Sequence, residues 1–111
     1  MTRDRKDELL PGTLEMLVLK TLSLAPLHGY GIAQHIRQLS KEVLQVEEGS
    51  LYPALQRMLM KGWLVGEWGR TSENRRARYY RVTTAGRKQL EHELDSYRRV
   101  AGAIALILRP A

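Results

Sequence analysis

The stretch "EEGSLYPALQRMLMKGWL", Glu47 to Leu64, decides the fold because its two sides differ in chemistry. One side carries apolar residues at helical spacing, and the other carries polar and basic residues. Serine is a favoured N-cap and glycine a favoured stop, so the pattern predicts a helix from Ser50 to Lys61 that ends at Gly62, with Pro53 tolerated in its first turn. The side chains expected to face the core are Leu51, Ala54, Leu55, Met58 and Leu59.

Two helices are predicted before this stretch. Residues 13–24 have apolar residues at helical spacing, with Thr13 as N-cap, and residues 30–39 form a shorter helix that Pro26 and the glycines at 29 and 31 open. Met16, Leu19 and Leu24 lie outside the main apolar stripe of the first helix, which must then be covered on more than one side and so favours a second subunit. The second helix is expected to bury Ile32, Ile36 and Leu39.

After Gly62 the apolar period changes from that of a helix to that of a strand. Residues 63–69 and 76–83 read as two antiparallel strands joined by a polar loop. Alternation places Tyr80 and Val82 on the inner face of the hairpin and residue Tyr79 on the outer face. The sequence therefore predicts a two-stranded hairpin rich in basic residues.

A final helix is predicted from Thr84, as its N-cap, to Leu108. Its apolar residues follow a 4-3-4-3-4 spacing, which is typical of the seam between paired helices. The end of this helix is apolar on nearly all sides and would be left in water by a monomer, so we expect a homodimer. The expected dimer contacts are Leu14, Leu17, Leu90, Leu94, Tyr97, Ala101, Ile104 and Leu108.

The positive charge of the chain is concentrated in one segment. The 111 residues carry a net charge of +6, and residues 70–88, with seven basic side chains and one acid, account for all of it. Six of the seven are arginines, whose guanidinium groups suit two-bond contacts with phosphate. This concentration favours a nucleic-acid surface over a merely solvated face.

Composition excludes several classes of function. The length fits one domain, and the absence of cysteine excludes disulfides, thiolate zinc sites and cysteine nucleophiles. The N-terminus lacks the apolar core of a signal peptide, and the apolar tract 100–108 is about half as long as a membrane span needs, so a cytoplasmic protein without membrane contact is expected. The three histidines and the acids form no metal or acid–base pattern, so we expect no enzyme, no cofactor and no metal.

The order of elements predicts an α+β, mainly α, winged helix-turn-helix domain over residues 10–83, followed by a dimerisation helix over 84–108. In this arrangement the third helix enters the major groove of double-stranded DNA and the hairpin, or wing, lies along the backbone. Glutamine can bond adenine, arginine can bond guanine or phosphate, and tyrosine can contact phosphate or a thymine methyl. The expected DNA-binding residues are Tyr30, Ser50, Tyr52, Pro53, Gln56, Arg57, Lys61, Arg75, Arg76 and Arg78.

Three segments in this order, "GYGIAQHI", the stretch from Glu47 to Leu64 and "RARYYRVTTAGRKQL", resemble the PadR family of bacterial transcriptional regulators over about residues 10–94. The resemblance implies a dimeric repressor that reads an inverted-repeat operator and pairs through its C-terminal helix. The single C-terminal helix is similar to that of the short subfamily. Some members of the family are relieved by a small aromatic or drug-like effector near the dimer interface. An effector of this class is one candidate partner, although ligand sensing by another member does not by itself carry over to the chain.

Two alternatives compete with this interpretation. A winged-helix domain can instead bind another protein or RNA, although the polar, basic outer face of the third helix disfavours protein docking. Peripheral membrane binding through the apolar C-terminus is disfavoured because that helix has no lysine-rich side. For single residues, Tyr30 suits packing at a helix start as well as phosphate contact, and Trp68 suits either the wing or a ligand pocket.

Overall fold

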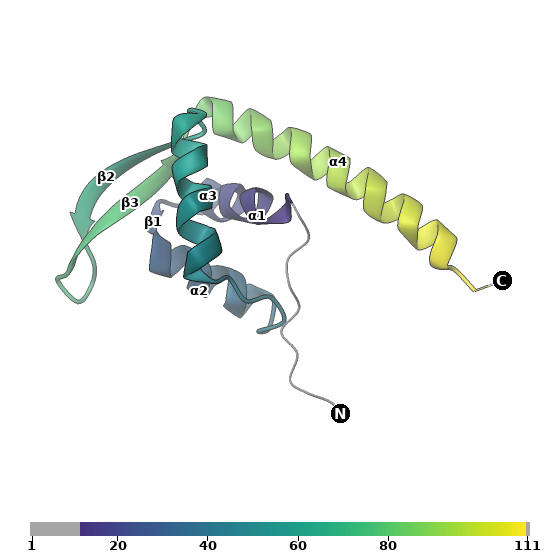
Figure 1. Cartoon of the computed structure of the whole chain (residues 1–111), viewed down its shortest axis with the longest axis horizontal. Coiled ribbons are helices and arrows are strands. Elements are labelled where there is room, and N and C mark those ends of the chain that lie inside the picture. Colours follow the sequence, from purple (N-terminus) through teal and green to yellow (C-terminus); the bar gives the residue numbers. More distant parts are fainter. Residues whose placement is uncertain (1–11, 111) are drawn as a thin grey trace.

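Residues 12–110, the part of the chain that this computed structural model describes, form four helices and one three-stranded sheet (Figure 1). This α+β, mainly α architecture confirms the predicted fold class; residues 10 and 11 of the predicted domain lie outside the described part. In chain order the elements are α1 (Thr13–Leu24), β1 (Leu27–His28), α2 (Gly29–Leu39), α3 (Glu48–Met60), β2 (Leu64–Arg70), β3 (Arg76–Val82) and α4 (Thr84–Leu108).

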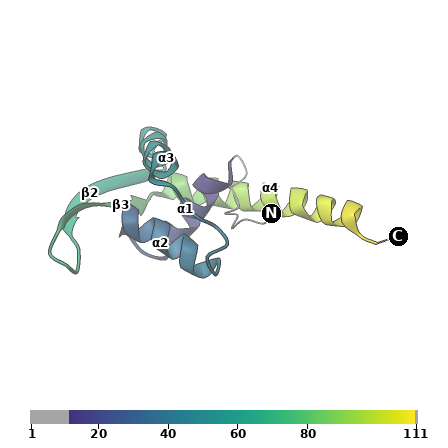
Figure 2. The same cartoon turned by 60° about the horizontal axis from the view of Figure 1, so that its bottom comes forward.

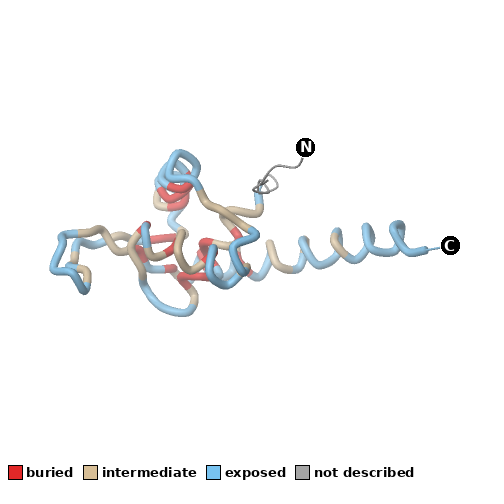
Figure 3. Tube along the Cα trace, turned by 90° about the horizontal axis from the view of Figure 1, so that it is seen from below, coloured by how far each residue is buried: buried red, intermediate tan, exposed pale blue. Residues whose placement is uncertain are grey.

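The core is built around α1, which contacts α2, α3, β3 and the first part of α4. Met16 and Leu19, at 8% and 0% exposed, are covered by these elements of the same chain, so the interpretation that these two residues call for a second subunit is wrong, whereas Leu24 is 60% exposed. The burial pattern in Figure 3 shows the core confined to the body of the molecule. The other buried apolar side chains are Val18, Leu22, Ile32, Ile36, Leu51, Ala54, Leu55, Met58, Leu64, Tyr80, Val82 and Leu90.

Helix α2 buries Ile32 and Ile36 as predicted, but Leu39 is 70% exposed. Leu39 is the last residue of α2, and the chain turns away directly after it through Lys41 and Glu42, which have φ of 53° and 67°. The prediction for Leu39 was therefore wrong because the helical stripe was extended one turn too far.

Helix α3 starts two residues before Ser50, and its N-cap is Glu47, not Ser50 as predicted. The Glu47 carbonyl accepts hydrogen bonds from the backbone N–H groups of Ser50 (3.0 Å) and Leu51 (2.9 Å). Pro53 consequently lies in the second turn and removes the donor that the Gly49 carbonyl would have used. Both residues are exposed, so water can bond that carbonyl.

The sheet has the order β1-β3-β2, with one strand more than the predicted hairpin. Strands β2 and β3 pair antiparallel from Leu64 opposite Val82 to Arg70 opposite Arg76. Strand β1 adds two residues, with Leu27 opposite Tyr80. A two-residue strand is too short to show a sequence period, which is why the pattern missed it.

The cap of α4 is Thr83, and the prediction of Thr84 was wrong by one residue. The Thr83 hydroxyl accepts from the Gly86 N–H (3.0 Å) and donates to the Gly62 carbonyl (2.7 Å), which joins the end of α3 to the start of α4. The N-cap of α1 is likewise one residue off: it is Gly12, with φ of 87°, and not Thr13. The sequence does not distinguish Thr83 from Thr84, because two adjacent threonines have the same capping propensity.

A Thr83→Ala substitution is expected to lower the free energy of unfolding by about 1–2 kcal/mol, because it removes the helix cap and the link to Gly62 together. Urea denaturation followed by far-UV circular dichroism measures the loss. Thr84→Ala is the matched control, since Thr84 is exposed and caps nothing. Equal losses in the two variants would contradict the assignment of the cap.

Helix α4 runs from the body into solvent, and the wing projects at the other end (Figures 1 and 2). The molecule measures 55 × 38 × 21 Å along its principal axes. Among the described residues, no helix combines the length and hydropathy that crossing a bilayer requires.

Candidate nucleic-acid interface

The two sides of α3 have the chemistry that its sequence predicts. Leu51, Ala54, Leu55 and Met58 are almost fully buried, and Leu59 is half-buried. Away from the core, the helix presents to solvent a surface that is mostly polar and becomes basic toward its C-terminal end. The exposed residues of α3 are Glu48, Gly49, Ser50, Tyr52, Pro53, Gln56, Arg57 and Met60, and the C-cap residue Lys61 is exposed as well.

Tyr52 lies on the flank of α3 that faces α2. A Cβ atom at Gly29 would stand 2.6 Å from the Tyr52 hydroxyl oxygen, so the glycine at the start of α2 makes room for this ring. Partial burial of the ring raises the pKa of the Tyr52 phenol above its usual 10.0, and the charges of Glu48 and Tyr80 raise it further. The hydroxyl therefore stays protonated at neutral pH and remains a hydrogen-bond donor for a phosphate.

The wing arginines follow the alternation of β3. Arg76 and Arg78 stand on the same face of the strand as Tyr80, whereas Arg81 stands on the other face, where it pairs with Glu67 at 3.0 Å. The inner face of the hairpin thus changes from apolar to cationic where the strands extend past the core. The net charge predicted for the wing is accordingly concentrated on one side of it.

Aromatic rings and glycines hold these arginines in place. The Arg76 guanidinium lies 4.4 Å from the centroid of Trp68, and that of Arg78 lies 5.8 Å from the centroid of Tyr80. A Cβ at Gly66 would come within 2.6 Å of the Arg78 Nε, so β2 leaves space for this side chain to cross it. Trp68 therefore has a place in the wing, where it orients an arginine.

The wing turn is fixed by its own hydrogen bonds. The Thr71 N–H donates to the Arg75 carbonyl (2.8 Å), and the Asn74 N–H donates to the Thr71 carbonyl (2.8 Å). Asn74 has φ of 63°, a conformation that asparagine tolerates better than most residues. The Tyr79 hydroxyl donates to the Arg70 carbonyl (2.9 Å) and ties the other face of the hairpin to its tip. Arg75 and Arg76 are thus carried by an ordered turn.

His28 caps α2 and has no counterpart among the predicted site residues. Its Nδ1 accepts from the Gly31 N–H at 3.0 Å, and its ring stacks near Tyr30 and meets Tyr79 edge to face. Histidine is a weak sequence signal for a cap, so only the structure reveals this role. The imidazole fixes the first turn of α2 beside the wing.

A concave pocket of about 900 Å³ lies between the start of α2, the flank of α3 and the inner face of the wing. It brings together Tyr30, Tyr52, Arg75, Arg76 and Arg78 of the predicted DNA-binding residues. It does not include Ser50, Pro53, Gln56 and Arg57, which lie elsewhere on α3, or Lys61 at the C-cap of this helix. The remaining lining residues are His28, Gly29, Gln34, Trp68, Thr71, Ser72, Glu73, Ala77 and Tyr80.

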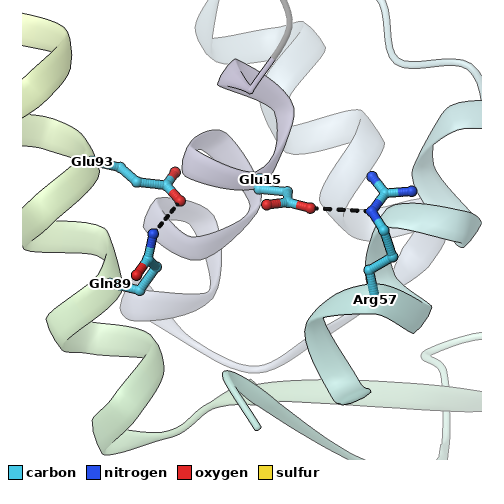
Figure 4. A network of polar contacts seen from close by, with 4 residues as sticks. All are labelled: Glu15, Arg57, Gln89 and Glu93. Carbon is cyan, nitrogen blue, oxygen red and sulfur yellow. Dashed lines mark hydrogen bonds and ion pairs between the residues drawn. The ribbon is translucent and has the colours of Figure 1, made fainter. Parts of the chain in front are cut away.

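Two of the predicted contacts on α3 are engaged by the chain itself. The Arg57 Nε lies 3.3 Å from the Glu15 Oε2 of α1 (Figure 4), and the Lys61 ammonium lies 4.6 Å from the centroid of Trp63. Both basic side chains are still exposed. Pairing across 42 residues of sequence has no local signal, so the sequence could not reveal the contact with Glu15.

The predicted dimer contacts divide into two groups. Leu90 is 7% exposed and belongs to the core of its own chain, and Leu14, Leu17 and Leu94 are half-buried against that core. Farther along α4, the side chains stand free of the body and line a groove of about 760 Å³ between α1 and α4. This second group consists of Tyr97, Ala101, Ile104 and Leu108.

Comparisons with known proteins agree on the class of protein. A regulator of Mycobacterium tuberculosis is 36% identical over 74 residues, which cover 67% of this chain and 65% of that protein. The crystal structure of a PadR-like transcriptional regulator from Bacillus cereus matches with a TM-score of 0.77 and 28% identity over 90% of this chain and 95% of the other. A regulator from Clostridium thermocellum, at 24% identity, shares the fold with a TM-score of 0.81 over 88% and 95% of the two chains. The model of the transcriptional regulator PadR-like family also matches residues 18–92, which is more than half of this chain. The chain therefore belongs to that family.

Proposed function

We propose that the chain is a homodimeric, sequence-specific repressor that binds an inverted-repeat operator in double-stranded DNA. The observation that carries this proposal is the pocket in which Tyr30, Tyr52 and the wing arginines Arg75, Arg76 and Arg78 converge. A cationic concave surface beside an exposed helix suits a duplex, whose backbone meets the wing while the helix enters the major groove. The family to which the chain belongs supports the same role.

Dimerisation is proposed through the free part of α4, helped by α1. Ile104, Ile107 and Leu108 are 50%, 81% and 75% exposed, which is a large apolar surface for a chain of this size. A second copy would cover this surface and place two α3 helices about one DNA turn apart, roughly 34 Å. The operator should then be a near-palindrome.

The proposed division of labour assigns affinity to the wing and discrimination to α3. Arg76→Ala is expected to weaken binding to every duplex and to flatten the dependence of log K on log salt by about 0.9, because one phosphate contact is lost. Gln56→Ala should instead reduce the preference for a selected duplex by roughly 1–3 kcal/mol and leave the salt slope unchanged. Fluorescence anisotropy titrations at several salt concentrations measure both effects.

Arg98→Ala serves as the matched control for Arg76→Ala, because it removes the same charge from an exposed position on α4. The control should change neither affinity nor slope appreciably. If Arg76→Ala and Gln56→Ala behaved alike on selected and random duplexes, the division of labour would be wrong.

A small aromatic or drug-like effector that relieves repression is part of the proposal, and the groove between α1 and α4 is its expected site in the pair. The apolar groove walls support this placement. Thermal unfolding with a panel of ligands is the first measurement, because neither Trp63 nor Trp68 lines this groove. A gel shift with the duplex upstream of the chain's own coding sequence separates the DNA-binding role from the alternative of a protein- or RNA-binding module without operator specificity.

A further inference from the structure

One ion pair joins the proposed recognition helix to the helix beneath it. Arg57 on α3 contacts Glu15 on α1 through its Nε, with 3.3 Å to the carboxylate Oε2, and Figure 4 shows the two side chains extended toward each other across the gap between these helices. Within the described residues the Arg57 guanidinium makes no other hydrogen bond or ion pair. The ion pair therefore holds the Arg57 guanidinium group only at its Nε atom.

The two partners differ in how firmly the fold holds them. The Glu15 side chain is only 18% exposed, and the next residue, Met16, is in the core, so the position of the carboxylate is set by the packing of α1. The Arg57 side chain is 56% exposed. The acid is thus the fixed member of the pair, and the arginine is the member that can leave.

A carboxylate and a DNA phosphate are competing partners for the same guanidinium. Both accept charge-assisted hydrogen bonds from arginine in similar geometry. On random DNA, Arg57 could add to affinity as a phosphate contact only by leaving Glu15. At a site with a guanine in register, a guanidinium that is already held by its Nε loses less side-chain freedom when its other nitrogen atoms bond the base edge.

We propose that Glu15 is a positioning residue for DNA recognition, which holds Arg57 for base contact and withholds it from phosphates. The inference rests on the proposed DNA-binding function and adds a source of specificity that lies outside the DNA-contacting surface. Glu15 lowers affinity for random DNA more than it lowers affinity for the operator. Glu15 thereby widens the difference between the affinity for the operator and the affinity for random DNA.

The test is Glu15→Gln in the full chain, with two duplexes of equal length: one enriched from a random library by the wild-type chain, and one of random sequence. Affinity for the random duplex is expected to rise roughly two- to fivefold, the fold-change equivalent of an exposed ion pair. The salt slope for that duplex should steepen by about 0.9, because Arg57 gains a phosphate. The ratio of the affinity for the enriched duplex to the affinity for the random duplex should fall.

Two controls separate positioning from charge and from folding. Glu91→Gln makes the same change of charge on the exposed side of α4 and should leave the affinity ratio unchanged. In an Arg57→Ala background, Glu15→Gln should have no effect on the ratio or on the slope, because the partner is absent. A merely structural role would lower affinity for both duplexes in either background.

The inference is overturned if Glu15→Gln matches Glu91→Gln, or if its effect persists without Arg57. In either case Arg76→Ala still reports on the proposed function, which would stand if that variant flattened the salt slope. A wild-type chain that did not bind duplex DNA would overturn both.

Discussion

An Ile104→Glu variant is expected to be monomeric and to bind a selected duplex at least about 100-fold more weakly than the wild-type chain. Ile104 lines the groove between α1 and α4 and is half exposed, so the proposed partner would bury it. Replacing a buried interface anchor costs roughly 2–4 kcal/mol, and each 1.4 kcal/mol is a factor of ten in the dissociation constant of the pair. A monomer contacts only one half-site of the duplex, so loss of the dimer also lowers the affinity for DNA.

Sedimentation velocity measures the change in assembly, and anisotropy measures the change in DNA affinity. Leu106→Glu is the matched control, because Leu106 is exposed on α4 and lies about 160° around the helix from Ile104. The control should remain dimeric. A dimeric Ile104→Glu variant, or a wild-type chain that sediments as a monomer at micromolar concentration, would refute the assigned dimer surface.

A Gly86→Ala variant is expected to lose about 3 kcal/mol of stability, at the upper end of what overpacking usually costs. The added Cβ would overlap the backbone carbonyl oxygen of Trp63 and stand 2.7 Å from the Val82 Cγ2. The Trp63 carbonyl cannot move freely, because the Thr83 N–H donates to it at 2.9 Å, and the Val82 side chain is buried in the core. The tight contact lies where α4 meets the base of the wing.

Thermal unfolding followed by circular dichroism should show the midpoint falling by roughly 10 °C or more. Gly102→Ala is the matched control on the same helix, since nothing lies within 4 Å of its added Cβ. That variant should be more stable than the wild-type chain by about 0.5–1 kcal/mol, the difference in helix propensity. A Gly86→Ala variant as stable as Gly102→Ala would show that the junction can relax.

The positions of long periodic segments were predictable from the sequence, but the residues that cap the helices were not. The stripe of Leu51, Leu55 and Met58 places α3 because side chains at helical spacing must share a face. The alternation of Tyr80 and Val82 places β3 for the same kind of reason. Caps were missed by one to three residues, as with Thr83, because capping depends on backbone geometry and the side chains near each helix end look alike.

The candidate site was predicted as a set of residues and not as a geometry. Tyr52, Arg76 and Arg78 were expected from their chemistry, but their convergence depends on Gly29 and Gly66, whose missing side chains leave space for them. A glycine in a sequence indicates freedom of the backbone and does not say which distant side chain occupies the space. The pair of Glu15 with Arg57 was invisible for a related reason, because it joins two helices only after both have packed.

A single residue, Thr83, separates the wing strand from α4, and its hydroxyl also bonds the end of α3. One side chain therefore links the C-terminal end of α3, the base of the wing and the start of α4. In the proposed homodimer, in which two α4 helices pack against each other, a change in the angle between these helices would also change the orientation of the two α3 helices. The distance between the two α3 helices would then be set by how the α4 helices cross, at the end of the molecule away from the duplex.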